Sequence, residues 1–238
     1  RMQPDMEVIV LEKTEDVSYS ACGMPYNIAD ADREMEDLVV RKAEVFRQKQ
    51  GIDLFTGYRA ETVDPANRTV TGTIMDSGEP FRFVYDRLLI ATGGRPVLPD
   101  LPGFDLPGVL TLKNLDDGRR IKAYIRKHSV KKAVIVGMGY IGLEMAEALR
   151  EREIAVDMVK PRPDLLPWMH RDLAATVEKE LIDNQVGLHA GCVITGIEKS
   201  ADGLNVVCED RSLPADMVLA AIGIRPNSEL AADAGLEI

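Results

Sequence analysis

The chain has few cysteines, few histidines and no long apolar run. Its 238 residues include three cysteines and three histidines, and its formal net charge is −10. No apolar run approaches the roughly 20 residues of a membrane-spanning helix, and no signal peptide opens the sequence. The acidic excess argues against general nucleic-acid binding, which needs a basic face. The sequence therefore predicts a cytoplasmic protein that binds neither membranes nor nucleic acid.

The cysteines, Cys22, Cys192 and Cys208, form no CxxC or other paired pattern, and the histidines lie far apart. Because zinc sites and disulfide frameworks need such clusters, we predict no metal site and no disulfide framework. Cys192 and Cys208 lie in apolar, strand-like runs that are typical of buried thiols. Cys22 differs, because the stretch VSYSACGMPYNIAD (17–30) places it at a predicted helix start.

Apolar periodicity predicts an α/β chain. EVIVLEK (7–13) is typical of a buried parallel strand, 36–51 has helical spacing, and 52–74 alternates as a short meander does. YDRLLIATGGRP (85–96) is predicted to be a strand that runs into two glycines. The stretch 96–108 is rich in proline and glycine and marks the best internal boundary.

Residues 131–160 read as strand, glycine turn, helix and strand, which is one βαβ unit. Gly137, Gly139 and Gly142 fit the pattern G-x-G-x-x-G inside it. The first glycine makes a tight turn, the second lets a pyrophosphate approach the backbone, and the third lets helix and strand pack closely. The helix N-terminus then offers free N–H groups to the phosphates. The motif predicts a dinucleotide-binding turn.

The end of the following strand carries basic residues. An acid at this position binds the ribose 2′-hydroxyl of NAD, whereas basic groups suit the 2′-phosphate of NADP. Here the strand ends at Lys160 and Arg162 follows. This favours NADPH, with two solvated loop cations as the alternative.

Glu12 ends the first predicted strand as a ribose-binding acid would. In a complete unit the glycine fingerprint lies about 20 residues earlier, before Arg1. We therefore expect the chain to be a fragment of a longer protein with two dinucleotide units. Such a pairing of a tightly bound and an exchangeable cofactor is typical of a flavoprotein reductase.

Five motifs in order resemble the pyridine nucleotide-disulfide oxidoreductases: the acid-ended strand, S-Y-x-x-C-G-M-P-Y, IATGGRP, GMGYIGLE and AIGIRPN. Within them the chain is similar to the single-cysteine branch of coenzyme A disulfide reductases, NAD(P)H oxidases and peroxidases, and persulfide reductases. The resemblance implies two Rossmann-like domains with central parallel sheets and small antiparallel meanders, the first domain incomplete. It implies a partial FAD-binding domain at 1–108, an NAD(P)-binding domain at 109–228, a return into the first at 229–238, and a homodimer with a role in redox homeostasis.

The resemblance also implies roles for single positions. Cys22 corresponds to the redox cysteine and Ser18 to the serine that accompanies it. The positions expected to contact FAD are Glu12, Lys13, Ala60, Ala91, Thr92, Gly93 and Lys113. The positions expected to contact NAD(P)H are Gly137, Gly139, Tyr140, Ile141, Gly142, Glu144, Lys160, Arg162 and Gly223. Among these, Tyr140 resembles an aromatic lid over the nicotinamide and Glu144 its supporting acid.

A one-cysteine site indicates which substrates fit. The thiolate is the nucleophilic form of cysteine, and a helix N-terminus favours it; Gly23 and Pro25 fit such a start. With no second cysteine nearby, the other sulfur comes from a substrate such as coenzyme A disulfide or a persulfide, or Cys22 forms a peroxide-derived sulfenate. Ala21 stands where coenzyme A disulfide reductases tend to have asparagine, so the thiol carrier stays open.

Two other functions stay open at this point. The same site would serve an NAD(P)H oxidase or peroxidase that works through a Cys22 sulfenic acid. A fragment that lacks the FAD glycine loop would instead act as a non-catalytic nucleotide-binding or redox-sensing module.

Overall fold

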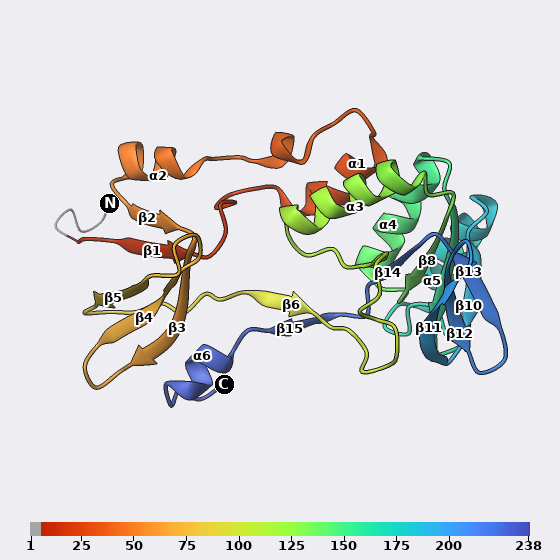
Figure 1. The fold of residues 1–238 in the computed structure, drawn as a ribbon. Coiled ribbons are helices and arrows are strands. Elements are labelled where there is room, and N and C mark those ends of the chain that lie inside the picture. The colour runs from red at the N-terminus through yellow and green to blue at the C-terminus, as the bar shows by residue number, and fades with distance from the viewer. Residues whose placement is uncertain (1–5) are drawn as a thin grey trace. The chain divides into compact units, whose positions relative to one another are not determined.

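The computed structural model describes residues 6–238 and divides the chain into two compact units. The first comprises residues 6–20, 39–94 and 226–238, and the second 21–38 and 95–225. The predicted α/β class is confirmed, since both units combine helices with parallel or antiparallel strands (Figure 1). Within the described residues, no helix has both the length and the apolar composition to cross a bilayer.

The first unit contains a parallel pair of strands and an antiparallel meander. Its elements are β1 (Ile9–Glu12), α2 (Ala43–Gln50), β2 (Asp53–Thr56), β3 (Tyr58–Asp64), β4 (Thr69–Ile74), β5 (Pro80–Val84) and α6 (Glu229–Asp233). The meander confirms the prediction over 58–74, whereas β2, at the start of the predicted range, pairs in parallel with β1. Helix α2 ends where Gly51 adopts a left-handed conformation and donates its N–H to the carbonyl of Phe46, so the predicted glycine stop is also confirmed.

Three predictions for this unit are wrong in part. β1 pairs in parallel with β2, but Ile9 and Val10 are 37% and 36% exposed rather than buried. The helix predicted over 36–51 is interrupted, because Val39 forms an antiparallel bridge with Tyr19. Residues 85–93 form no strand: no described segment forms a ladder with them, and Leu89 is 87% exposed.

The second unit is built on a fully parallel five-stranded sheet of order β10-β9-β8-β14-β7. Its strands are β7 (Val109–Leu110), β8 (Lys132–Val136), β9 (Ala155–Lys160), β10 (Gly187–Ala190) and β14 (Met217–Ala220). A separate antiparallel sheet contains β11 (Ile194–Ser200), β12 (Gly203–Cys208) and β13 (Ser212–Ala215). The short strands β6 (Gly94–Pro96) and β15 (Ile224–Pro226) pair with each other.

The helices of this unit are α1 (Met24–Ala29), α3 (Leu115–His128), α4 (Tyr140–Glu151) and α5 (Arg171–Asp183), with short 3-10 helices η1 (Ala21–Gly23) and η2 (Met35–Leu38). The βαβ unit predicted over 131–160 is confirmed as β8, α4 and β9. Its strands are buried on both faces, as parallel strands are, and Val134 and Ile135 of β8 are 0% exposed. This core fixes the carboxyl edge of the sheet, where the glycine turn lies.

Candidate functional site

Cys22 lies in η1, which runs directly into α1, and its thiol is free and exposed. Gly23 is the N-cap of α1 and Pro25 lies in its first turn, so the predicted helix start is confirmed. Proline fits there because the first N–H groups of a helix have no partner within the helix. Met24, Pro25 and Ile28 are buried, which anchors the segment while Cys22 stays open to solvent.

The C-terminal end of α1 is held by one cation from α3 and another that follows α4 directly. The Nζ of Lys122, in α3, donates to the carbonyls of Asn27 (2.8 Å) and Asp30 (2.7 Å), and also to the carbonyl of Arg33. Arg152, just after α4, donates to the carbonyl of Ile28 at 3.1 Å. Positive groups satisfy the free carbonyls at a helix end and oppose its dipole. The segment that carries Cys22 is therefore fixed from its far end.

The same contacts enclose Asn27, which is 1% exposed. Its Oδ1 accepts from Lys122 at 3.2 Å, and its Nδ2 donates to the carbonyl of Glu34 at 2.8 Å. Burial, together with the charge of Arg152, lowers the pKa of Lys122 below its ordinary value. No sequence motif marks Lys122, because its partners lie about 90 residues away.

Ser18, the residue expected to accompany Cys22, belongs to the first unit, whereas Cys22 belongs to the second. The backbone carbonyl of Ser18 accepts from Val40 N at 2.9 Å and from Arg41 N at 3.3 Å. These bonds fix its backbone beside residues 39–41. Its role beside Cys22 stays a prediction.

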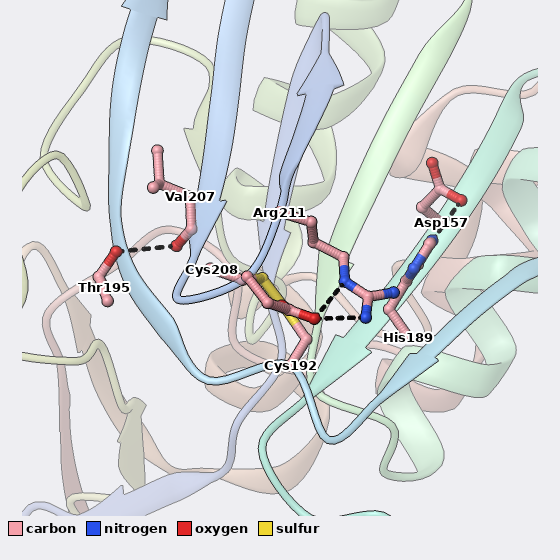
Figure 2. Close-up of a disulfide and its surroundings, with 8 residues drawn as sticks. Asp157, His189, Cys192, Thr195, Val207, Cys208 and Arg211 are labelled. Atoms are coloured by element: carbon pink, nitrogen blue, oxygen red, sulfur yellow. Dashed lines mark hydrogen bonds and ion pairs between the residues drawn. A yellow bond between two sulfur atoms is a disulfide. The ribbon is translucent and has the colours of Figure 1, made fainter.

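Cys192 and Cys208 are joined in a disulfide, so the prediction of two separate buried thiols is wrong (Figure 2). Their Cα atoms are 5.8 Å apart and 16 residues separate them in sequence. Both belong to the buried core cluster of the second unit, at 2% and 5% exposure, so burial itself is confirmed. No local motif predicts the pairing, because the two cysteines meet only when β11 and β12 pair antiparallel to each other.

The three glycines of the turn after β8 have different surroundings. Gly137 has φ +110°, and a Cβ there would collide with the backbone of Ala221. A Cβ on Gly142 would lie 2.5 Å from the carbonyl oxygen of Gly137, so helix and turn pack without room for a side chain. At Gly139 a Cβ would meet nothing within 4 Å. The turn therefore leaves open space at the N-terminus of α4, and free N–H groups at a helix N-terminus are suited to binding phosphate.

Three more predicted positions lie on the first turns of α4. Tyr140 is its first residue and is 65% exposed, and Ile141 and Glu144 are partly buried. Tyr140 and Glu144 are four residues apart, so they share one face of the helix. The hydroxyl of Tyr140 accepts a hydrogen bond from Trp168 Nε1 at 3.2 Å.

Lys160 and Arg162 are placed differently at the end of β9. Lys160 donates a hydrogen bond to the carbonyl of Asp164 in the loop that follows, and burial lowers its pKa. Arg162 is exposed, and its own carbonyl accepts from Gly191 N at 3.3 Å. Of the two cations, Lys160 thus holds its own loop, whereas Arg162 presents its guanidinium to solvent.

In the first unit, Glu12 lies at the carboxyl end of β1, opposite Thr56 of β2. Its Oε1 accepts from Thr14 N at 2.8 Å and from Thr14 Oγ1 at 2.7 Å. Lys13 beside it is exposed. A carboxylate at the carboxyl end of a parallel strand occupies the place where such folds bind a ribose.

The segment ATG (91–93) is fastened to Asn227 of the motif AIGIRPN. The hydroxyl of Thr92 donates to the Asn227 carbonyl, and Asn227 Nδ2 donates to the Thr92 carbonyl at 2.9 Å. Asn227 N also donates to the carbonyl of Gly93 at 2.9 Å. Ala91, Thr92, Gly93 and Asn227 line an open cleft of about 640 Å³ in this unit. Sequence reasoning missed Asn227, although the motif that contains it was recognised.

Of the remaining predicted positions, Ala60 belongs to the first unit and Lys113 and Gly223 to the second. Ala60 lies in β3 beside a bulge, paired with Gly72. Lys113 lies in the second unit, and its backbone N–H donates to Asp117 Oδ2 at 2.8 Å. Gly223 has φ +132°, and its carbonyl accepts from Val97 N at 3.0 Å.

The sequence matches the profile of the pyridine nucleotide-disulphide oxidoreductase family over residues 2–238. The NADH oxidase of Methanocaldococcus jannaschii is 34% identical over 98% of this chain, and the NAD(P)H sulfur oxidoreductase (CoA-dependent) of Pyrococcus furiosus is 34% identical over 100% of it. The chain spans about half the length of these curated relatives, 52% and 53%. The solved NAD-dependent persulfide reductase from A. fulgidus matches with a TM-score of 0.92 and 33% identity, over 98% of this chain and 44% of that one. The chain belongs to the pyridine nucleotide-disulphide oxidoreductase family.

Proposed function

We propose that the chain is the FAD- and NAD(P)H-binding part of a disulfide or persulfide reductase that works through the single redox cysteine Cys22. One observation carries the proposal: Cys22 is exposed and free, while Cys192 and Cys208 are closed onto each other. The chain therefore has one thiol for chemistry and no second thiol to resolve it. We infer that the partner sulfur comes from the substrate.

The residues present fit both cofactors. Open space at Gly139, in front of the α4 N-terminus, suits the pyrophosphate of NAD(P)H. Glu12 and the turn at Thr92 and Gly93 suit the ribose and ring of FAD, and the cleft beside that turn has room for part of such a ligand. When bound, FAD takes hydride from NAD(P)H and supplies two electrons for breaking a disulfide.

Cys22 would act by thiol–disulfide exchange. Its thiolate attacks one sulfur of the substrate R–S–S–R′, the Cys22–S–S–R bond forms, and R′S⁻ leaves. Two electrons and one proton then release RSH and restore the Cys22 thiolate. With a persulfide R–S–SH, attack on the outer sulfur leaves a Cys22 persulfide and RS⁻, and the same two electrons then release sulfide. The exposure of Cys22 allows a substrate to approach in either case.

NADPH is the nucleotide that the basic end of β9 favours. Arg162 is exposed and suits a 2′-phosphate, whereas Lys160 is engaged with the carbonyl of Asp164. We assign the preference to Arg162. NADH remains the second nucleotide, in line with the NADH oxidase named among the relatives.

The wider setting follows from the family resemblance. We propose a cytoplasmic homodimer that acts on small molecules in redox homeostasis and binds neither nucleic acid nor membranes. Residues 1–108 would contribute to FAD binding, 109–228 to NAD(P)H binding, and 229–238 to the return toward the FAD site. The relatives named as a CoA-dependent sulfur oxidoreductase and a persulfide reductase support the substrate class.

An NADH oxidase among the relatives favours a second candidate function. In it, the Cys22 thiolate attacks one peroxide oxygen, which gives a sulfenic acid and releases hydroxide. Two electrons and one proton then return the sulfenic acid to the thiolate and release water. Both candidates use the same free cysteine. They differ in the molecule that reoxidises the reduced enzyme.

Anaerobic stopped-flow mixing separates them. The full-length FAD-loaded protein is reduced with one equivalent of NADPH and then mixed with coenzyme A disulfide, a small-molecule persulfide or hydrogen peroxide, while flavin absorbance is followed. Fast reoxidation by a disulfide or persulfide supports the proposal. Reoxidation by peroxide alone contradicts it and supports the second function. A protein that carries no flavin but still binds NADPH would be a nucleotide-binding module.

A further inference from the structure

The loop after β9 is anchored to its own unit. Leu166 is 1% exposed, so its side chain pins the loop to the core. Met169 N donates to the Leu166 carbonyl at 2.9 Å, and Lys160 holds the carbonyl of Asp164. These contacts hold the loop on both sides of the buried leucine. Trp168 follows Leu166 by two residues and is thereby held in place.

Trp168 meets Tyr140 across the carboxyl edge of the sheet. Its Nε1 donates to the Tyr140 hydroxyl at 3.2 Å, and the ring centroids lie 5.8 Å apart with the planes tilted by 56°. Both side chains stay largely exposed, at 57% and 65%. Two exposed aromatic rings joined by a hydrogen bond are not explained by core packing.

The pair spans the place where a nucleotide would enter. Tyr140 follows Gly139 directly, and the space in front of Gly139 is open. Trp168 comes from the loop after β9, on the ribose side of the same sheet edge, since β8 and β9 are neighbours. The hydrogen bond therefore links the glycine turn before α4 to the loop after β9.

We propose that Trp168 is a positioning residue that fixes the ring of Tyr140 beside the glycine turn where the nucleotide would bind. The inference rests on the proposed function, because it takes NAD(P)H as the ligand of this glycine turn. Trp168 acts through its indole N–H, which donates to the Tyr140 hydroxyl. Within the described residues, this N–H has no other acceptor. Loss of this bond frees the phenol ring to rotate. Binding of the nucleotide must then also order the Tyr140 side chain, which weakens the affinity.

The test measures nucleotide binding and flavin reduction separately. The full-length FAD-loaded enzyme is mixed anaerobically with increasing NADPH, which yields a dissociation constant and a limiting rate of flavin reduction. Trp168→Phe keeps an aromatic ring but removes the donor, and Tyr140→Phe removes the acceptor. Each is expected to weaken NADPH binding about three- to tenfold, the range of one net hydrogen bond, with a smaller change in the limiting rate.

The double variant gives the sharper result. Because both substitutions break one bond, Trp168→Phe with Tyr140→Phe is expected to bind NADPH no more weakly than the weaker single variant. Tyr124→Phe is the matched control: it removes a tyrosine hydrogen bond of 3.1 Å to the Asp216 carbonyl in the same unit, away from the glycine turn. Its NADPH affinity should equal that of the wild type.

Two results would overturn the inference while leaving the proposed function intact. One is a Trp168→Phe variant that binds NADPH as tightly as wild type. The other is a double variant in which the two losses multiply, which would mean that the residues act independently. If NADPH and NADH both fail to reduce the wild-type flavin, the proposed function itself fails, and the inference fails with it.

Discussion

The two cysteine regions of the chain differ in surroundings and in what their sulfur atoms can do. Cys22 is exposed, follows a loop and begins a short helical segment. Cys192 and Cys208 are almost fully buried in the core and joined to each other. A thiol can attack a substrate only if it is accessible and has no internal partner. The difference supports the proposal that Cys22 carries the chemistry and that the other pair stabilises the fold.

The largest expected effect comes from removing the exposed thiol. Cys22→Ser should lower disulfide or persulfide reductase turnover by about a thousandfold or more, because the nucleophile is lost. Flavin reduction by NADPH should remain, since it does not need the thiol. Steady-state turnover and anaerobic flavin reduction are measured side by side. Turnover close to that of wild type would show that Cys22 is not the nucleophile.

The second effect concerns the buried pair. Cys192→Ala with Cys208→Ala should lower the free energy of unfolding by about 3 kcal/mol, as expected for a disulfide that closes a loop of this length. Turnover through Cys22 should persist under native conditions. Urea unfolding with and without a thiol reductant measures the free energy of unfolding.

The reductant supplies the control for the disulfide. It should destabilise the wild type and Cys22→Ser alike, but leave the doubly substituted protein unchanged. Equal stability of the wild type with and without reductant would contradict a stabilising disulfide.

A smaller effect is expected from the cation that holds the far end of α1. Lys122→Met should lower the free energy of unfolding by about 1–2 kcal/mol, because three backbone carbonyls lose a charged donor. Lys127→Met, an exposed position on the same helix, is the matched control and should change stability by less than about 0.5 kcal/mol. Equal losses of unfolding free energy in the two variants would mean that the hydrogen bonds of Lys122 contribute no specific stabilisation.

The smallest effect is a pH dependence beside the disulfide. Burial alone would raise the pKa of Asp157, but hydrogen bonds from His189, at 2.9 Å, and Lys132 outweigh it and hold the pKa below its ordinary value of 3.8 (Figure 2). An acid whose pKa is lower in the folded than in the unfolded protein stabilises the fold. This stabilisation is fully present above the unfolded-state pKa and is lost as the pH falls through the folded-state pKa. Urea unfolding between pH 5 and pH 2 should therefore show a loss below about pH 4, of under about 1 kcal/mol.

Asp157→Asn is the control for this titration. The variant has no carboxylate at this position, so its stability should change less than that of wild type over the same acidic range. An identical pH profile in both proteins would show that Asp157 carries no such contribution.

Local patterns predicted the parts that depend on neighbouring residues. The turn at Gly137, Gly139 and Gly142 follows from spacing, because strand, turn and helix lie within one short segment. The helix start after Cys22 follows from Gly23 and Pro25 in the same way. These features need no contact from a distant part of the chain, so sequence alone was sufficient.

Contacts between distant segments could not be predicted. The pairing of Cys192 with Cys208 depends on how β11 turns onto β12. The hydrogen bonds from Lys122 to the end of α1 and from Trp168 to Tyr140 join segments that belong to no common sequence motif. The strand expected over 85–93 failed for the same reason, because a strand needs a partner and local composition cannot supply one.

The central claim, one free redox cysteine and one closed pair, is tested most directly by mapping where substrate sulfur becomes attached. The enzyme is mixed with a disulfide substrate without NADPH, quenched with acid, treated with an alkylating reagent and analysed by peptide mass spectrometry without reduction. The substrate thiol is expected on Cys22, and the peptides that contain Cys192 and Cys208 should stay joined by an intact disulfide. Substrate thiol on Cys192 or Cys208, with Cys22 alkylated, would contradict a single redox cysteine at position 22.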